Sequence, residues 1–120
     1  MPRPNPNRQG VYIGIEGMVE FAKDGIVSKA LLRAPDKEVS LFCMTTGQML
    51  SGHTSGYPAI IHVLKGEGEV TLGDKKYIAK VNDWFFMPAN LLHALFSTDN
   101  LVFLLTLFKK ADQAVGAVAQ

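Results

Sequence analysis

The stretch AIIHVLKGEGEVTLGDKKYIAKV, residues 59–81, consists of short apolar runs separated by glycines and charged residues. Within it, Gly73 and Asp74 lie between VTL at 70–72 and YIA at 77–79, an arrangement typical of a tight β-hairpin. The stretch therefore predicts neighbouring β-strands that are joined by tight turns.

Similar apolar runs continue on both sides of this stretch, each bounded by turn residues. They are VYIGIEGMVEF at 11–21, IVSKALLRA at 26–34, EVSLFCMT at 38–45, DWFFMP at 83–88 and LVFLLTLF at 101–108. Many short strands with turn signals between them favour an all-β sandwich or barrel.

The segment PANLLHALF, residues 88–96, fits two structures. Its proline start, good helix formers and leucines at helical spacing favour a short helix from Ala89 to Phe96. A turn followed by a strand fits the neighbouring runs equally well. The local pattern alone does not distinguish the two.

Both ends of the chain differ from the middle. Three prolines among the first six residues prevent a helix and weaken any strand ladder, so we expect residues 1–10 to form a flexible arm. Residues 109–120 are rich in alanine, and we expect a tail that frays or forms a terminal helical turn. A chain of 120 residues is expected to fold as one domain, which we place at residues 11–108.

Charge and composition exclude several classes of partner. The chain has 12 Lys and Arg against 11 Asp and Glu, a net charge of +1, and no block of like charge. We therefore expect no nucleic-acid partner, and no run is long enough to predict a membrane partner. The single cysteine, Cys43, cannot form an intramolecular disulfide and is expected to be a buried apolar residue. The N-terminus lacks the apolar stretch of a secretory signal, so we expect a cytoplasmic location.

The three histidines differ in their surroundings. His53 and His93 each follow a turn-rich segment, so we expect both at strand starts near the mouth of a barrel, where ligand sites are often found. His62 lies inside the apolar run AIIHVL. If Ile61 and Val63 face the interior, strict alternation directs His62 outward.

Two sets of residues at fixed offsets carry a family resemblance. Gly47, His53 and Gly66 match the first cupin motif, and Pro88 and His93 match the second. From about residue 41 to residue 108, the chain therefore resembles a small single-domain cupin of the conserved-barrel, cupin-2-like kind. The resemblance implies one double-stranded β-helix, or jelly roll, that makes up nearly the whole protein. It also favours the turn and strand for residues 88–96.

The sequence departs from both motifs. Where the family has its second histidine and its metal-binding glutamate, this chain has Ser55 and Ala59; Asn82, Asn90 and Ser97 replace two glycines and an asparagine. Two of the four metal ligands that the resemblance implies are therefore missing. A facial-triad iron site needs two histidines and a carboxylate, and zinc needs three or four protein ligands.

The resemblance implies a divalent metal ion, Fe, Mn, Ni or Zn, which His53 and His93 alone would hold weakly. Cys43, His62 and Glu20 are further candidates for completing the ligand shell. The sequence assigns none of these three a position near the two histidines.

Two functions from different classes follow. In the first, the protein binds a small-molecule ligand in the barrel cavity, with His53, Ser55 and His93 as polar groups and Ile61 and Val63 in the apolar wall. In the second, His53 and His93 bind the metal of an oxygenase or isomerase, and a residue outside the motifs completes the shell. A purely structural interaction module is a third possibility, which an interior filled by aromatic side chains would favour.

The runs at 84–87 and 101–108 are apolar throughout, so we expect both faces of these strands to be covered. One face would meet the barrel core, and the other a partner subunit or the N-terminal segment. Because an open apolar face is costly in water, we expect a homodimer.

Overall fold

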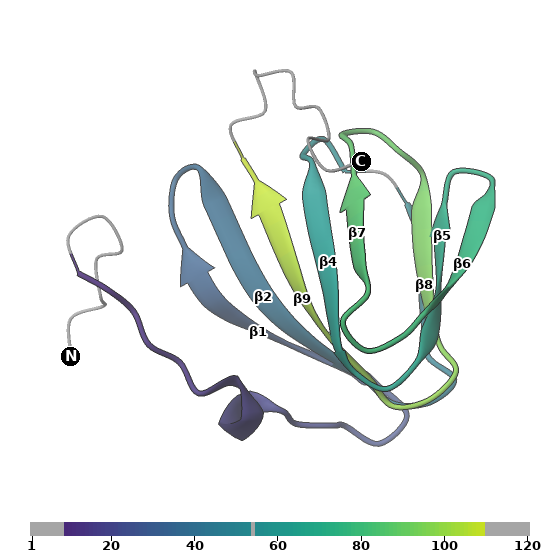
Figure 1. Cartoon of the computed structure of the whole chain (residues 1–120), viewed down its shortest axis with the longest axis horizontal. Helices are drawn as coiled ribbons and strands as arrows, with labels where there is room; N and C mark the ends of the chain where they lie inside the picture. The colour runs from purple at the N-terminus through teal and green to yellow at the C-terminus, as the bar shows by residue number, and fades with distance from the viewer. Residues whose placement is uncertain (1–8, 54, 110–120) are drawn as a thin grey trace.

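The computed structural model describes residues 9–53 and 55–109, which form two antiparallel sheets packed face to face (Figure 1). The elements in chain order are η1 (Ile15–Met18), β1 (Ile26–Arg33), β2 (Lys37–Met44), β3 (Met49–His53), β4 (Ala59–Lys65), β5 (Gly68–Leu72), β6 (Lys75–Ala79), β7 (Trp84–Met87), β8 (His93–Ser97) and β9 (Leu101–Phe108). The predicted all-β class is confirmed, since the one helical element within the described ranges is the single 3-10 turn η1.

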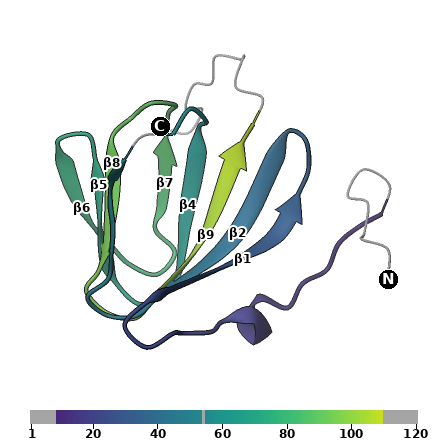
Figure 2. The ribbon, with the colours of Figure 1, turned by 180° about the vertical axis from the view of Figure 1, so that it is seen from behind.

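Strand β9 lies at the centre of the larger sheet, between strands that are distant from it in sequence. The five-stranded sheet has the order β1-β2-β9-β4-β7, and the four-stranded sheet has the order β3-β8-β5-β6. All neighbouring strands run antiparallel, and Figure 2 shows the same two sheets from behind. This arrangement is the predicted double-stranded β-helix, or jelly roll.

Strand β4 alternates strictly between its two faces. Ala59, Ile61 and Val63 are buried against the second sheet, whereas His62 is only partly buried and faces outward. His62 lies opposite Trp84 on β7 and Leu104 on β9. The prediction that His62 points away from the barrel interior is confirmed.

The interior between the sheets is almost entirely apolar. Its fully buried members come from both sheets and are Met44, Ala59, Ile61, Val63, Val70, Ala79, Met87, Leu95, Leu101 and Phe103. The ring of Phe103 stacks on that of Phe42, with 5.1 Å between the ring centroids. The core is therefore closed by stacked aromatic rings beside Val63, the cross-strand neighbour of Phe103.

The outer face of the larger sheet has its own apolar cover. An N-terminal strap, residues 11–21, packs Ile15, Met18 and Val19 against a second buried cluster. That cluster consists of Leu41, Cys43 and Val102. The strand predicted over residues 11–21 is therefore wrong, because the apolar residues of this run cover a sheet face instead of joining the sheet.

Two ion pairs hold the strap to the barrel. Glu16 pairs with Lys65 on β4, and Glu20 pairs with Lys29 on β1 at 2.9 Å. The hydrogen bond and the charge of Lys29 hold the pKa of Glu20 below its ordinary value. The predicted alternative that the N-terminal segment covers the outer face thus holds over β1, β2 and the start of β9.

Residues 88–96 form a turn and a strand rather than a helix. Strand β8 begins at His93, and Asn90 in the preceding turn has a φ of 68°. The backbone N–H of Gly73 donates to the carbonyl of Leu92, which ties this turn to the β5–β6 hairpin. The hairpin itself is confirmed, since Leu72 pairs with Lys75 around Gly73 and Asp74.

The expectations for the chain ends fall almost entirely on residues outside the described ranges. These are residues 1–8 of the predicted arm and residues 110–120 of the predicted tail. Within the ranges that are described, no helix has the length and hydropathy required to cross a membrane.

Gly66 is a backbone position at which the fold tolerates no side chain. Its φ is 78°, and a Cβ atom there would lie 1.7 Å from the carbonyl oxygen of Asn100. Both the left-handed backbone and the close approach of the β8–β9 loop therefore require glycine. This is the glycine that closes the first sequence motif.

Replacing Gly66 by alanine is expected to lower the free energy of unfolding by more than about 2 kcal/mol, because the loop after Ser97 must move. Urea denaturation measures this loss. Gly56→Ala is the matched control, since its Cβ would meet nothing within 4 Å and its φ is not left-handed. A Gly66→Ala protein as stable as the control would contradict the packing described above.

Candidate functional site

The two histidine positions of the sequence motifs lie opposite each other in one β-ladder. His53, the last residue of β3, pairs with His93, the first residue of β8. The predicted strand start is therefore confirmed for His93 and wrong for His53, which ends its strand. Both histidines lie at what we call the barrel mouth, the end at which β3 and β7 end and β4 and β8 begin. Two residues that are forty positions apart in the sequence are thus direct neighbours on adjacent strands.

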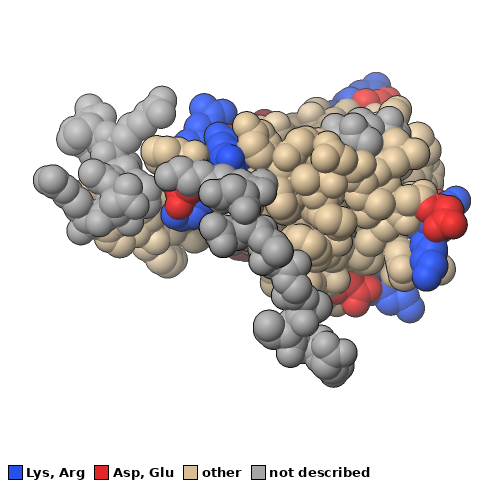
Figure 3. Space-filling model, turned by 90° about the horizontal axis from the view of Figure 1, so that it is seen from above, with Lys and Arg blue, Asp and Glu red and all other residues tan. Residues whose placement is uncertain are grey.

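The larger sheet contributes a row of cross-strand neighbours at the same end. Arg33 on β1, Glu38 on β2, Leu107 on β9, Ala59 on β4 and Met87 on β7 are paired in succession. The segment 88–92 joins this row directly to β8. Seen from this end, the molecule presents a broad uncharged surface with its charges toward the margins (Figure 3).

His93 is the titratable side chain that the described interior buries most deeply. It is 7% exposed, and its ring Nδ1 lies 2.9 Å from the carbonyl oxygen of Leu91. Because a carbonyl oxygen can only accept, Nδ1 carries the proton and donates. This bond fixes the orientation of the ring and assigns the lone pair of a neutral imidazole to Nε2.

The apolar wall beside the mouth comes from β4. Ala59 is 2% exposed, and it pairs with Met87 on one side and Leu107 on the other. Ile61 follows one layer deeper, and Val63 a further layer down. Both residues face the interior, as the strand alternation predicts.

Ser55 holds two loops of the mouth together. Its hydroxyl oxygen accepts the backbone N–H of Tyr57 at 3.1 Å, and its carbonyl oxygen accepts the N–H of Asn90 at 2.7 Å. Ser55 is partly buried. Its oxygen atoms therefore shape the turn before β4 and fix it against the turn before β8.

Three substitutions in the second motif preserve its backbone. Asn82 and Asn90 stand where the family has glycines, and their φ angles are 73° and 68°. Asparagine is among the few non-glycine residues that enter this left-handed region readily. The fully buried Ser97 accepts the N–H of Gln48 and donates to the carbonyl of Thr45, which joins β8 to the β2–β3 turn.

The three candidates for completing a metal shell lie outside the barrel interior. Cys43 is buried beneath the strap on the outer face, and His62 faces outward beside Trp84. Glu20 belongs to the strap and pairs with Lys29. The hypothesis that one of them joins the two motif histidines is therefore not supported by their places in the fold.

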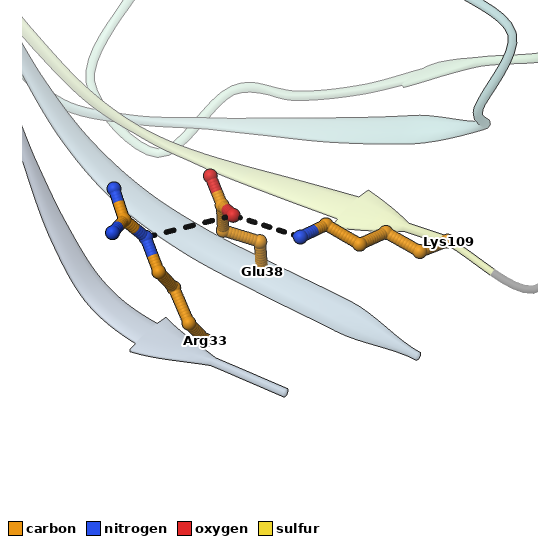
Figure 4. Close-up of polar contacts among 3 residues, drawn as sticks. All are labelled: Arg33, Glu38 and Lys109. Carbon is orange, nitrogen blue, oxygen red and sulfur yellow. Dashed lines mark hydrogen bonds and ion pairs between the residues drawn. The ribbon is translucent and has the colours of Figure 1, made fainter. Parts of the chain in front are cut away.

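A charged cluster at the edge of the mouth was missed by the sequence reasoning. Glu38 receives a hydrogen bond from Lys109 at 2.9 Å and lies 3.7 Å from the guanidinium Nε of Arg33 (Figure 4). The alternation of β2 held a signal for it, since Glu38 shares its parity with Phe42 and Met44 of the core. The contribution of Lys109 had no such signal, because that residue follows the last strand.

Fold and mouth geometry together define a single-barrel protein with a histidine-bearing end, and comparison with known proteins identifies its family. Residues 40–107 match the family described as Cupin domain. The chain belongs to the cupin family.

Solved structures agree with this assignment. A conserved protein of unknown function from Streptococcus pyogenes is similar with a TM-score of 0.77 and 24% identity, over 95% of this chain and 98% of that one. A cupin superfamily protein from Desulfitobacterium hafniense has a TM-score of 0.76 and 22% identity, over 83% and 92% of the two chains. A cupin 2 conserved barrel domain protein from Leptotrichia buccalis has a TM-score of 0.75 and 32% identity, over 81% of this chain and 47% of that one. A search of curated proteins found no match.

The donor set at the mouth does not fit the metal site that the family implies. Ala59 places a buried methyl group at the glutamate position, on the inner face where a carboxylate would be required. Among the described residues, no group of three or more His, Cys, Asp or Glu is arranged to hold a metal ion. A facial triad or a zinc site needs at least three protein ligands, so the residues found here fall short of that requirement.

The double substitution Ser55→His and Ala59→Glu is expected to create metal retention. It restores the motif ligands on a backbone whose turns already have the family geometry. Elemental analysis of protein purified without chelator or affinity metal should find near-stoichiometric divalent metal in this variant and far less in the natural chain.

Ser55→His combined with Ala59→Gln is the control, because glutamine adds the same bulk without the carboxylate. Near-stoichiometric metal in the natural chain that disappears in His93→Ala would contradict this account. It would instead indicate that a residue outside the motifs completes the shell, as the metal-dependent alternative requires.

Proposed function

We propose that this cupin binds a small organic molecule at the barrel mouth, with His93 and His53 as its polar anchors. The observation that carries the proposal is His93, a buried imidazole in a largely apolar interior. Burying a polar ring is unfavourable unless its nitrogens are hydrogen-bonded, and the contact with Leu91 accounts for Nδ1. An imidazole held in one orientation in this way is suited to orienting a polar group of a ligand.

The walls of the mouth support the same function. Ala59, Leu107 and Met87 form one apolar row, with Ile61 and then Val63 beneath it as the floor. Small-molecule sites combine apolar walls with a few polar groups that set the ligand's orientation. His53, which pairs with His93 across the ladder, and Ser55 at the same end are the further polar groups of the proposed site.

A fragment titration followed by histidine ring NMR tests the proposal, because the chain has only three histidines. Bound fragments should shift the ring signals of His53 and His93 and leave His62 unchanged. His93→Ala and His53→Ala should each weaken fragment binding about tenfold, the loss expected for one buried hydrogen bond.

His62→Ala is the matched control, since this histidine lies on the outer face of the same barrel. Binding that tolerates His53→Ala and His93→Ala but fails in His62→Ala would overturn the proposal. Fragment shifts confined to the outer face would do the same.

We also propose that the protein is a homodimer that pairs through the outer faces of β4 and β7. The strap covers the outer face over β1, β2 and part of β9, but Trp84 on β7 remains 59% exposed. Ile60 and Phe86 are cross-strand neighbours on the same face. A second copy of this face would remove the indole and these apolar neighbours from water.

Trp84→Glu is expected to shift the protein from dimer to monomer, because the charge would be buried in an apolar contact. Sedimentation equilibrium measures the change in mass. Ile78→Glu is the control, as Ile78 is 64% exposed on β6 at the far edge of the other sheet. A monomeric natural protein at all concentrations, or a dimer that Trp84→Glu leaves intact, would contradict the proposal.

A further inference from the structure

The charged cluster at the edge of the mouth has an excess of positive charge. Two cations, Arg33 and Lys109, face one carboxylate, Glu38, and both approach the same atom, Oε1. The side chains of Glu38 and Lys109 are 22% and 29% exposed, so this pair is largely withdrawn from bulk water, whereas the side chain of Arg33 is 63% exposed. Figure 4 shows the two cations on opposite sides of the carboxylate.

The cluster lies on the inner surface of the sheet, in line with the apolar wall of the mouth. Glu38 is the cross-strand neighbour of Leu107, which is itself the neighbour of Ala59. Neighbouring strands are about 4.8 Å apart, so the backbones of Glu38 and Ala59 are roughly 10 Å apart. A molecule seated on the wall would thus lie within one or two strand spacings of the cations.

The charge balance of this cluster differs from that of ordinary surface pairs on the barrel. Lys76 and Glu69 form a one-to-one pair at 3.6 Å on the β5–β6 hairpin and leave no charge over. The mouth cluster has two cations for one carboxylate, and it lies next to the apolar row of Leu107 and Ala59. A charge next to low-dielectric walls acts more strongly on a ligand than one surrounded by water.

We propose that the ligand of the barrel mouth is a small apolar molecule with a single acidic group, and that Lys109 and Arg33 bind this group. The inference deepens the proposed small-molecule function and rests on it. The apolar body lies over the partly exposed Leu107, and its far end faces the two histidine positions across the mouth. Packed sheets are about 10 Å apart, so an acid of the size of an aromatic carboxylate spans this distance.

Glu38 has a defined part in this arrangement. It holds the two cations at the inner edge of the sheet and lowers their combined charge from two to one. A monoanion is therefore matched by the cluster, whereas a neutral molecule gains nothing from it. Removing the Glu38 charge should strengthen anion binding, and removing either cation should weaken it.

A matched pair of probes, 1-naphthoate and 1-naphthamide, tests the inference by NMR titration of the natural chain and its variants. The two have nearly the same shape and differ by one negative charge. Lys109→Gln and Arg33→Gln are expected to weaken naphthoate binding roughly three- to tenfold, with naphthamide affinity unchanged. Glu38→Gln should strengthen naphthoate binding, and added salt should weaken it.

Lys76→Gln is the control, because it removes one positive charge from the distant hairpin pair. Melting temperatures separate binding from a purely structural clip between β1, β2 and the end of β9. A clip would lower the melting temperature in all three cluster variants without distinguishing the probes.

The outcomes also separate this inference from the proposed function. If both probes shift the His93 signals equally and Lys109→Gln changes neither affinity, the acidic-ligand inference is overturned while the small-molecule function stands. If neither probe perturbs His93 or the mouth residues, the proposed function and this inference both fail.

Discussion

The five-stranded sheet is apolar on both faces, and the rest of the structure depends on how the two faces are covered. Strand β9 shows the constraint most clearly, since Phe103 faces the barrel core while Val102 faces outward, and both are buried. The four-stranded sheet covers the inner face, and the N-terminal strap covers part of the outer one. Packing of the two sheets and docking of the strap thus both remove apolar surface of the larger sheet from water.

At the barrel mouth, the apolar contacts between the two sheets end and polar side chains begin. Around the stacked rings of Phe42 and Phe103 the interior is filled with apolar side chains. Apolar residues continue from there to Ala59 and Leu107 at the mouth. At that level the smaller sheet contributes its two histidine positions. In the larger sheet, the row of cross-strand neighbours at the mouth ends in the charged residues Glu38 and Arg33. At this end of the barrel, polar side chains therefore lie on both sides of one apolar row of residues.

The motif residues keep their structural roles, whereas two of the positions that carry metal ligands in the family have no donor side chain of the family's kind here. Gly66 still allows the close approach of the β8–β9 loop, and Asn82 and Asn90 still provide left-handed turns. A methyl group at Ala59 occupies the place of a charged ligand. The turns depend on backbone conformation, which asparagine can supply, whereas a metal depends on donor atoms, which alanine cannot.

Much of the fold followed from local pattern. The hairpin at Gly73, the inward parity of Ile61 and Val63, and the outward direction of His62 all depend on period-two alternation and turn chemistry, which nearby residues determine. The pairing of His53 with His93 followed from the family motifs, because no local pattern links residues forty positions apart.

The sequence by itself determined which residues turn, which alternate and where the donor atoms of a metal site are missing. The tertiary structure alone decided that residues 11–21 form a cover rather than a strand, since that depends on an apolar face assembled from β1, β2 and β9. It also decided that Lys109 meets Arg33 and Glu38, because the end of β9 reaches the β1–β2 hairpin only when β9 pairs with β2. Local propensity acts over a few residues, whereas these contacts exist only after the whole sheet has formed.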